Sequence, residues 1–63
     1  MCESAAYVIR KNGEEKLLDD VTFLKPDRGR VFLRNLFGKE LLIKGRIEEI
    51  RFMDHKIILV EDE

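Results

Sequence analysis

Short runs of apolar side chains, many of them alternating with polar ones, recur along the whole chain. Alternation of this kind places every second side chain on the same face of a β-strand. Tyr7, Val8 and Ile9 are residue types that favour strands, and similar runs follow at short intervals. The pattern predicts strands over residues 4–10, 14–18, 21–25, 30–35, 39–44, 46–53 and 56–60.

Turn-forming residues separate these predicted strands. Asn12-Gly13 predicts a tight hairpin, because both central residues of a type I′ turn have positive φ, which Asn and Gly accept. Residues 26–29, Pro-Asp-Arg-Gly, predict a second turn, and Asp54-His55 predicts a third. Gly45 marks a bend, and the mixed spacing of apolar side chains after it indicates a bulge near Glu48-Glu49.

Six or seven short strands with tight turns and no long helix predict an all-β fold. In a chain of 63 residues we expect a small, strongly bent antiparallel sheet that closes into an SH3-like or Sm-like barrel. This length allows one domain, residues 1–63, with a thin core. Such domains are usually reinforced by disulfides, a metal or a second subunit. One cysteine cannot form an internal disulfide.

The last predicted strand is apolar at every position from Ile57 to Val60. A continuous apolar run indicates that both faces of a strand are covered. We therefore expect that one face of this strand meets a second subunit, together with the N-terminal strand.

Composition and charge narrow the class of protein. Hydrophobic residues make up 44% of the chain and charged residues 40%, which is typical of a globular domain with a well-solvated surface. The formal net charge of -1 does not supply the positive field that strong nonspecific nucleic-acid binding requires. No stretch has the length of a membrane span or the pattern of a signal peptide. A single unpaired cysteine favours a reducing compartment, so we expect a cytoplasmic protein.

Cys2, the only cysteine, is the main candidate for chemistry. If Met1 is removed, the amine and the thiolate of Cys2 close one chelate ring around a metal ion. If Met1 stays, its amine, the deprotonated Cys2 amide and the thiolate form two fused rings. Either donor set favours a square-planar ion such as Ni(II) or Cu(II). In the form without Met1, one chain supplies only two donors, and two chains about a two-fold axis supply four. The alternative is a thiol without a role, or an intermolecular disulfide.

The other polar groups give weaker indications. His55, the only histidine, suits Ni, Cu and Zn, but no second ligand accompanies it at a metal-binding spacing. Carboxylates cluster at residues 19–20, 48–49 and 61–63 without the alternation of a calcium loop, so we expect solvated faces there. No acid–base pair or nucleophile–base pair stands out, and we expect a protein that is not an enzyme.

Basic and aromatic residues in the middle of the chain suggest a second class of function. Small β-barrels bind single-stranded nucleic acid through strips of such residues. In the alternative interpretation, the rings lie in the core and the cations in water. The strip consists of Arg28, Arg30, Arg34 and Lys39 with Phe32 and Phe37.

A series of short motifs extends over nearly the full length. They are Met1-Cys2-Glu3, Ala6-Tyr7-Val8, Gly13-Glu14-Glu15, Leu17-Leu18 with Asp20-Val21, Asn35-Leu36-Phe37-Gly38, Gly45-Arg46-Ile47-Glu48-Glu49-Ile50, and Asp54-His55-Lys56-Ile57 running into Leu59. In the order and spacing of these motifs, with cysteine at position two, the chain resembles the CooT family. These are small nickel-binding proteins associated with the maturation of carbon monoxide dehydrogenase.

The resemblance implies a homodimer of small β-barrels in which Cys2 of each chain is the nickel ligand, with nearby main-chain nitrogens completing the site. It also implies a Ni(II) chaperone whose client is carbon monoxide dehydrogenase. It does not identify His55 as a ligand, so His55 stays outside the predicted site. The alternative function is a small RNA-binding β-barrel module, a label that related sequences often carry and that rests on the shape of the barrel.

Overall fold

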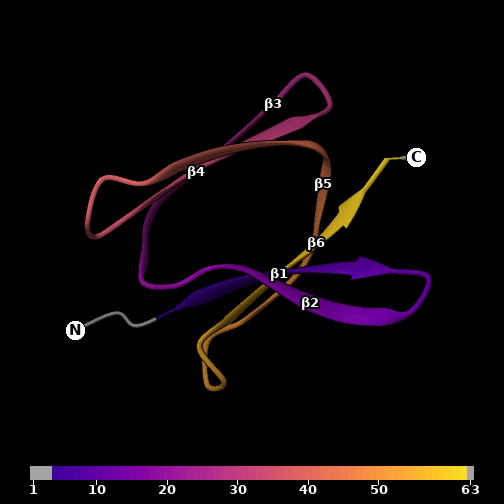
Figure 1. Ribbon diagram of the computed structural model, residues 1–63, viewed down its shortest axis with the longest axis horizontal. Coiled ribbons are helices and arrows are strands. Elements are labelled where there is room, and N and C mark those ends of the chain that lie inside the picture. Colours follow the sequence, from indigo (N-terminus) through magenta and orange to yellow (C-terminus); the bar gives the residue numbers. More distant parts are fainter. Residues whose placement is uncertain (1–3, 63) are drawn as a thin grey trace.

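Six strands make up most of the described chain. The computed structural model describes residues 4–62. The strands are β1 Ala5–Arg10, β2 Gly13–Leu18, β3 Val21–Asp27, β4 Arg30–Asn35, β5 Glu40–Arg51 and β6 Lys56–Glu61. They form one sheet in the order β2-β1-β6-β5-β4-β3 (Figure 1). The predicted all-β class is confirmed.

β5 is the strand at which the sheet bends. Residues 40–44 pair with β4, and residues 45–51 pair with β6. The change of partner falls at Gly45, where φ is 157°, so the predicted bend is confirmed. The register shift between Ile47 and Glu49 confirms the predicted bulge. The two strands expected over residues 39–44 and 46–53 are therefore one curved strand, which Figure 1 shows passing from one half of the sheet to the other.

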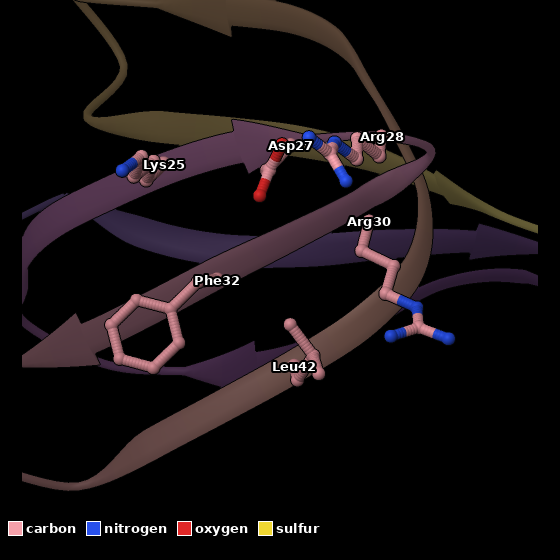
Figure 2. A pocket seen from close by; sticks show the side chains of 6 residues that line it. All are labelled: Lys25, Asp27, Arg28, Arg30, Phe32 and Leu42. Carbon is pink, nitrogen blue, oxygen red and sulfur yellow. Dashed lines mark ion pairs between the residues drawn. The ribbon is translucent and has the colours of Figure 1, made fainter.

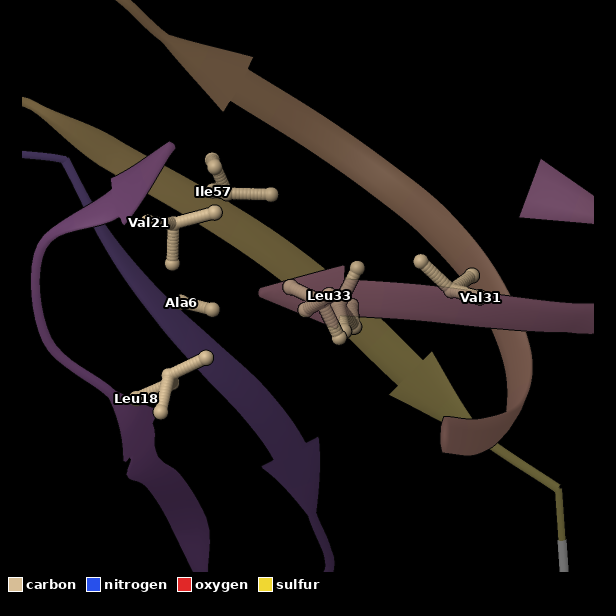
Figure 3. Packing of buried hydrophobic residues seen from close by; sticks show 7 residues of the cluster. Ala6, Leu18, Val21, Val31, Leu33 and Ile57 are labelled. Carbon is tan, nitrogen blue, oxygen red and sulfur yellow. The ribbon is translucent and has the colours of Figure 1, made fainter. Parts of the chain in front are cut away.

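The core lies between the two halves of the bent sheet. Ala6 and Leu59 come from the half that contains β1 and β6, and Leu33 comes from the β3–β4 half; all three are completely buried. Figure 3 shows Leu33 between Val31 and the side chains of the opposite half. Burial of one such leucine contributes about 1.5–3 kcal/mol relative to leaving it exposed. The full cluster is Ala6, Leu18, Val21, Val31, Leu33, Ile57 and Leu59.

The expectation of a closed antiparallel barrel is wrong in two respects. β1 and β6 run parallel, from Ala5 opposite Lys56 to Ile9 opposite Val60, so the sheet is mixed. β2 and β3 are its two edges, and within residues 4–62 no ladder joins them. Only two residues connect β2 to β3, yet the two strands belong to different halves of the sheet. The two halves of the bent sheet already cover the core, so burial of the apolar side chains does not require β2 to pair with β3.

All three predicted turns are present, but their residues differ from those in the structure. The turn predicted at Asp54-His55 comprises residues 52–55. Arg10 pairs with Gly13, so the loop of the first hairpin is Lys11-Asn12 rather than Asn12-Gly13. The turn between β3 and β4 is the one in which both central residues have positive φ, Arg28 at 52° and Gly29 at 78°. This is the pattern of a type I′ turn. Pro26 belongs to β3, an edge strand, where its missing N–H is tolerated.

The apolar last strand is covered within one chain. β6 is central, with β1 on one side and β5 on the other. Ile57, Ile58 and Leu59 are all buried, although Ile58 points to the face opposite the other two. The expectation that both faces are covered is confirmed, but these side chains are already covered without a second subunit. Residues 57–59 therefore do not need a second subunit to be covered, and the dimer contact expected at residues 57–60 stays a prediction.

Asn35 organises the turn between β4 and β5. Its buried Oδ1 accepts hydrogen bonds from the backbone N–H groups of Phe37 (3.0 Å) and Lys39 (2.8 Å). Asn35→Ala leaves both N–H groups without this acceptor, so we expect the free energy of unfolding to fall by about 2 kcal/mol in urea denaturation. The control is Thr22→Ala, because the hydroxyl of Thr22 makes an exposed contact of 3.5 Å with the carbonyl oxygen of Arg34. This substitution should change the free energy of unfolding by less than about 0.5 kcal/mol. An equal effect of the two substitutions would contradict this role.

Candidate functional site

The start of the described chain is held by two backbone hydrogen bonds. Val21 N donates to Ser4 O (2.8 Å), and Ala5 N donates to His55 O (2.9 Å). The chain at Ser4 therefore lies between the start of β3 and the turn that precedes β6. Cys2, the predicted metal ligand, lies outside the described residues. What the structure establishes is that the chain is fixed two residues after Cys2.

The turn from β5 to β6 is the neighbour of this chain start. It comprises residues 52–55 and ends at His55, whose φ is 55°. The imidazole of His55 is exposed, and its carbonyl is the acceptor for Ala5 N. The proximity of His55 to the first strand follows from the parallel pairing of β1 with β6, which local sequence patterns do not reveal.

An apolar hollow opens beside Ser4, in the gap where β3 does not pair with β5. Phe52 is 82% exposed, and Ile50 and Phe23 are 44% and 43% exposed. Met53, in the same turn as Phe52, is 93% exposed. The sequence analysis missed this surface because it placed Phe52 and Met53 at the end of a strand over residues 46–53 and not in the turn, where apolar side chains are unusual. The hollow is lined by Ser4, Val21, Thr22, Phe23, Leu24, Ile50, Phe52 and Ile57.

The structure divides the predicted basic and aromatic strip between two places. Arg30, Phe32 and Arg34 alternate along β4 on the face opposite the core. Phe37 and Lys39 instead border a different hollow, with residues of β2 and of the turn that follows it. Phe37 is 79% exposed, so the interpretation that placed it in the core is wrong.

A basic hollow occupies the outer face of the β3–β4 hairpin and β5 (Figure 2). Across the strands, Phe32 lies between Lys25 and Leu42, and Arg30 lies opposite Lys44. We call this surface the basic face and define it as Lys25, Arg28, Arg30, Phe32, Leu42 and Lys44. The predicted strip did not include Lys25 and Leu42. They lie beside Phe32 because of the strand register, which the sequence alone does not give.

Arg34 is engaged beside the basic face. Its Nε lies 3.0 Å from Glu40 Oε2. Its guanidinium carbon lies 5.2 Å from the ring centre of Phe23 and 5.3 Å from that of Phe32. The two rings meet edge to face, with centres 6.0 Å apart. Arg34 therefore supports the rings and is not an available cation.

The carboxylate clusters behave as solvated, ion-paired groups. Glu49 accepts a hydrogen bond from Arg51 (2.8 Å), which holds the pKa of Glu49 below its usual value. Asp19 pairs with Lys16 at 2.9 Å, and Glu61 pairs with Arg10 at 3.0 Å. Over residues 4–62, no group of three or more His, Cys, Asp or Glu side chains could hold a metal ion.

No helix in the part of the chain that the structure describes could cross a membrane.

The class defined by these features is a small all-β protein built on one open mixed sheet, with exposed apolar and basic surfaces. The family model of CooT, described as a CO dehydrogenase accessory protein, matches residues 1–60. The crystal structure of a protein from Carboxydothermus hydrogenoformans assigned to CooT is 32% identical, with a TM-score of 0.87. The match covers 98% of this chain and 100% of that one. Among curated proteins there is no match.

This chain belongs to the CooT family of carbon monoxide dehydrogenase accessory proteins. The resemblance found in the sequence motifs is confirmed. An accessory protein of this family is not an enzyme, in agreement with the prediction.

Proposed function

We propose that this protein captures Ni(II) through the thiolate of Cys2 and main-chain nitrogen, and delivers it to carbon monoxide dehydrogenase during maturation of that enzyme. The observation that carries the proposal is the family match over residues 1–60, which includes the only thiol of the chain. Thiolate and nitrogen donors favour the square-planar geometry of Ni(II) over hard ions such as Mg²⁺ or Ca²⁺.

The frame around Ser4 supports this role. The hydrogen bonds of Ser4 O and Ala5 N fix the chain two residues after Cys2. A site near the chain start also permits release, because the donors of a client can replace those of the carrier by ligand exchange.

A homodimer is part of the proposal. In the form without Met1, one Cys2 supplies one nitrogen and one sulfur, so two chains complete a four-donor site. The exposed apolar side chains of Ile50, Phe52 and Met53 lie on the same end of the molecule as Ser4. Surface of that kind is favourable to bury between subunits. The lone thiol would be kept reduced in the cytoplasm, where we place the protein.

A nickel titration of the reduced protein tests this proposal. We expect absorbance in the thiolate-to-nickel charge-transfer region that saturates at one Ni(II) per two chains. Sedimentation at the same concentrations should show a dimer. One Ni(II) per chain would retain the metal site but overturn the shared one, and absence of the charge-transfer band would overturn nickel binding by Cys2.

A further inference from the structure

The basic face has an excess of positive charge in a chain whose net charge is -1. It carries four cations, and Asp27 is the one carboxylate among the residues lining its hollow. Within residues 4–62, Lys25, Arg30 and Lys44 form no ion pair. Arg28 reaches Asp27 only at 3.8 Å. Such a cluster of available cations attracts anionic groups and orients them as they approach.

Arg28 occupies a backbone position that disfavours its residue type. It is the first central residue of the type I′ turn, with φ of 52°. Asn, Asp or Gly accepts this conformation most readily, and other residues lose about 1–2 kcal/mol in it. The side chain of Arg28 is 93% exposed, so packing does not compensate for that cost. Backbone strain of this kind is concentrated at binding sites, and here it places a guanidinium at the rim of the hollow.

Apolar surface lies between these cations. Leu42 is 60% exposed, and its cross-strand neighbour Phe32 is half-buried. Figure 2 shows both side chains on the strands below Lys25 and Arg28, with Arg30 beside Leu42. An apolar centre within a charged rim is the arrangement of a protein-binding surface.

We propose that the basic face docks an acidic segment of a protein partner, with an apolar side chain of that segment against Phe32 and Leu42. Its carboxylates meet Lys25, Arg28 and Arg30 around this contact. This docking surface goes beyond metal capture and does not depend on Cys2. It assigns protein binding to a surface on β3, β4 and β5, separate from the metal ligand of the proposed function.

Single-stranded nucleic acid fits the same surface less well. Bases bind by stacking on exposed aromatic faces, whereas Phe23 and Phe32 already contact each other and the guanidinium of Arg34. Nucleic-acid affinity depends on how many phosphates the protein neutralises. The basic face offers only four cations on a chain with net negative charge. An acidic peptide needs only a few carboxylates and one apolar anchor.

NMR titration of the full-length, isotope-labelled protein tests the proposal. The probe is a short synthetic peptide of alternating Glu, Asp and Leu residues. We expect chemical-shift changes confined to β3, β4 and residues 40–44, with none at residues 52–55. Arg30→Glu should weaken binding at least tenfold, which corresponds to about 1.4 kcal/mol. Lys11→Glu, an exposed cation in the turn between β1 and β2, introduces the same change of net charge and should leave the affinity within about twofold.

Three results would overturn the proposal. One is the absence of localised shift changes with the peptide, and another is equal weakening by Arg30→Glu and Lys11→Glu, which would show a response to net charge alone. The third is tighter binding of an oligothymidylate to the same face, which would replace the peptide by nucleic acid. Cys2→Ser should retain peptide binding, so failure of the nickel proposal and failure of this one are separately visible.

Discussion

Replacing Cys2 by serine is expected to abolish nickel binding. Cys2 is the only residue of the chain that can supply a thiolate, and a serine hydroxyl is neither a soft donor nor ionised at neutral pH. Loss of an outer-shell partner already lowers metal affinity 10–100-fold, so loss of the ligand itself should lower it by more than about 100-fold. The measurement is isothermal titration with Ni(II) under reducing conditions, alongside loss of the charge-transfer band.

His55→Asn is the matched control for this prediction. His55 carries the only imidazole of the chain. It lies close to Ala5, because its carbonyl accepts the hydrogen bond from Ala5 N. Asparagine tolerates positive φ, so it suits the 55° at this position. We expect the variant to bind Ni(II) as the parent protein does. Loss of binding in His55→Asn with retention in Cys2→Ser would place the ligand in the β5–β6 turn and contradict the role of Cys2.

The strands could be predicted from sequence because their information is local. Alternation along β4, from buried Val31 to half-buried Phe32 to buried Leu33, is visible in the residue types themselves. The bend at Gly45 and the bulge beside Glu48 were visible for the same reason, as interruptions of a local period. The expected strand boundaries therefore differ from the observed ones by only a few residues at most positions.

The arrangement of the strands could not be predicted in the same way. Alternation states which side chains share a face, but it does not state which strand is the neighbour. The parallel pairing of β1 with β6 joins the two ends of the chain, and no turn connects these strands to reveal it. The open edge at β3 has the same origin, because closure depends on whether distant strands meet.

The candidate sites could be predicted from the sequence to different degrees. Cys2 could be named as a candidate because it is the only thiol of the chain and because the family resemblance points to it, and its role stays a prediction since it lies outside residues 4–62. The basic face was only partly identifiable: Arg30 and Phe32 were named, whereas Lys25 and Leu42 join them through the β3–β4 and β4–β5 registers. The apolar hollow beside Ser4 depends on the unpaired edge of β3 and was missed with it.

Gly45→Ala is expected to unfold much of the protein. An added Cβ would lie 2.0 Å from the carbonyl oxygen of Val60 and 3.0 Å from Cα of Glu61. Both atoms are backbone, so relief requires separating β5 from β6, the central pair that carries the core residue Leu59. We expect a loss of about 3–5 kcal/mol of unfolding free energy. A domain of this size has only about 3–9 kcal/mol in total, and circular dichroism with urea denaturation measures the change.

Gly38→Ala separates the steric effect from the backbone effect. Gly38 also has positive φ, 85°, but nothing lies within 4 Å of the position of an added Cβ. Its substitution should cost only about 1–2 kcal/mol, the penalty for a left-handed residue with a side chain. Equal losses of unfolding free energy in the two variants would contradict the close approach of the Gly45 backbone to Val60 and Glu61 as the reason that position 45 requires glycine. The bent sheet requires a larger loss of unfolding free energy for Gly45→Ala than for Gly38→Ala. In Gly45→Ala the amides of β6 should also exchange earlier than those of β4, because β6 is the strand that the added Cβ displaces.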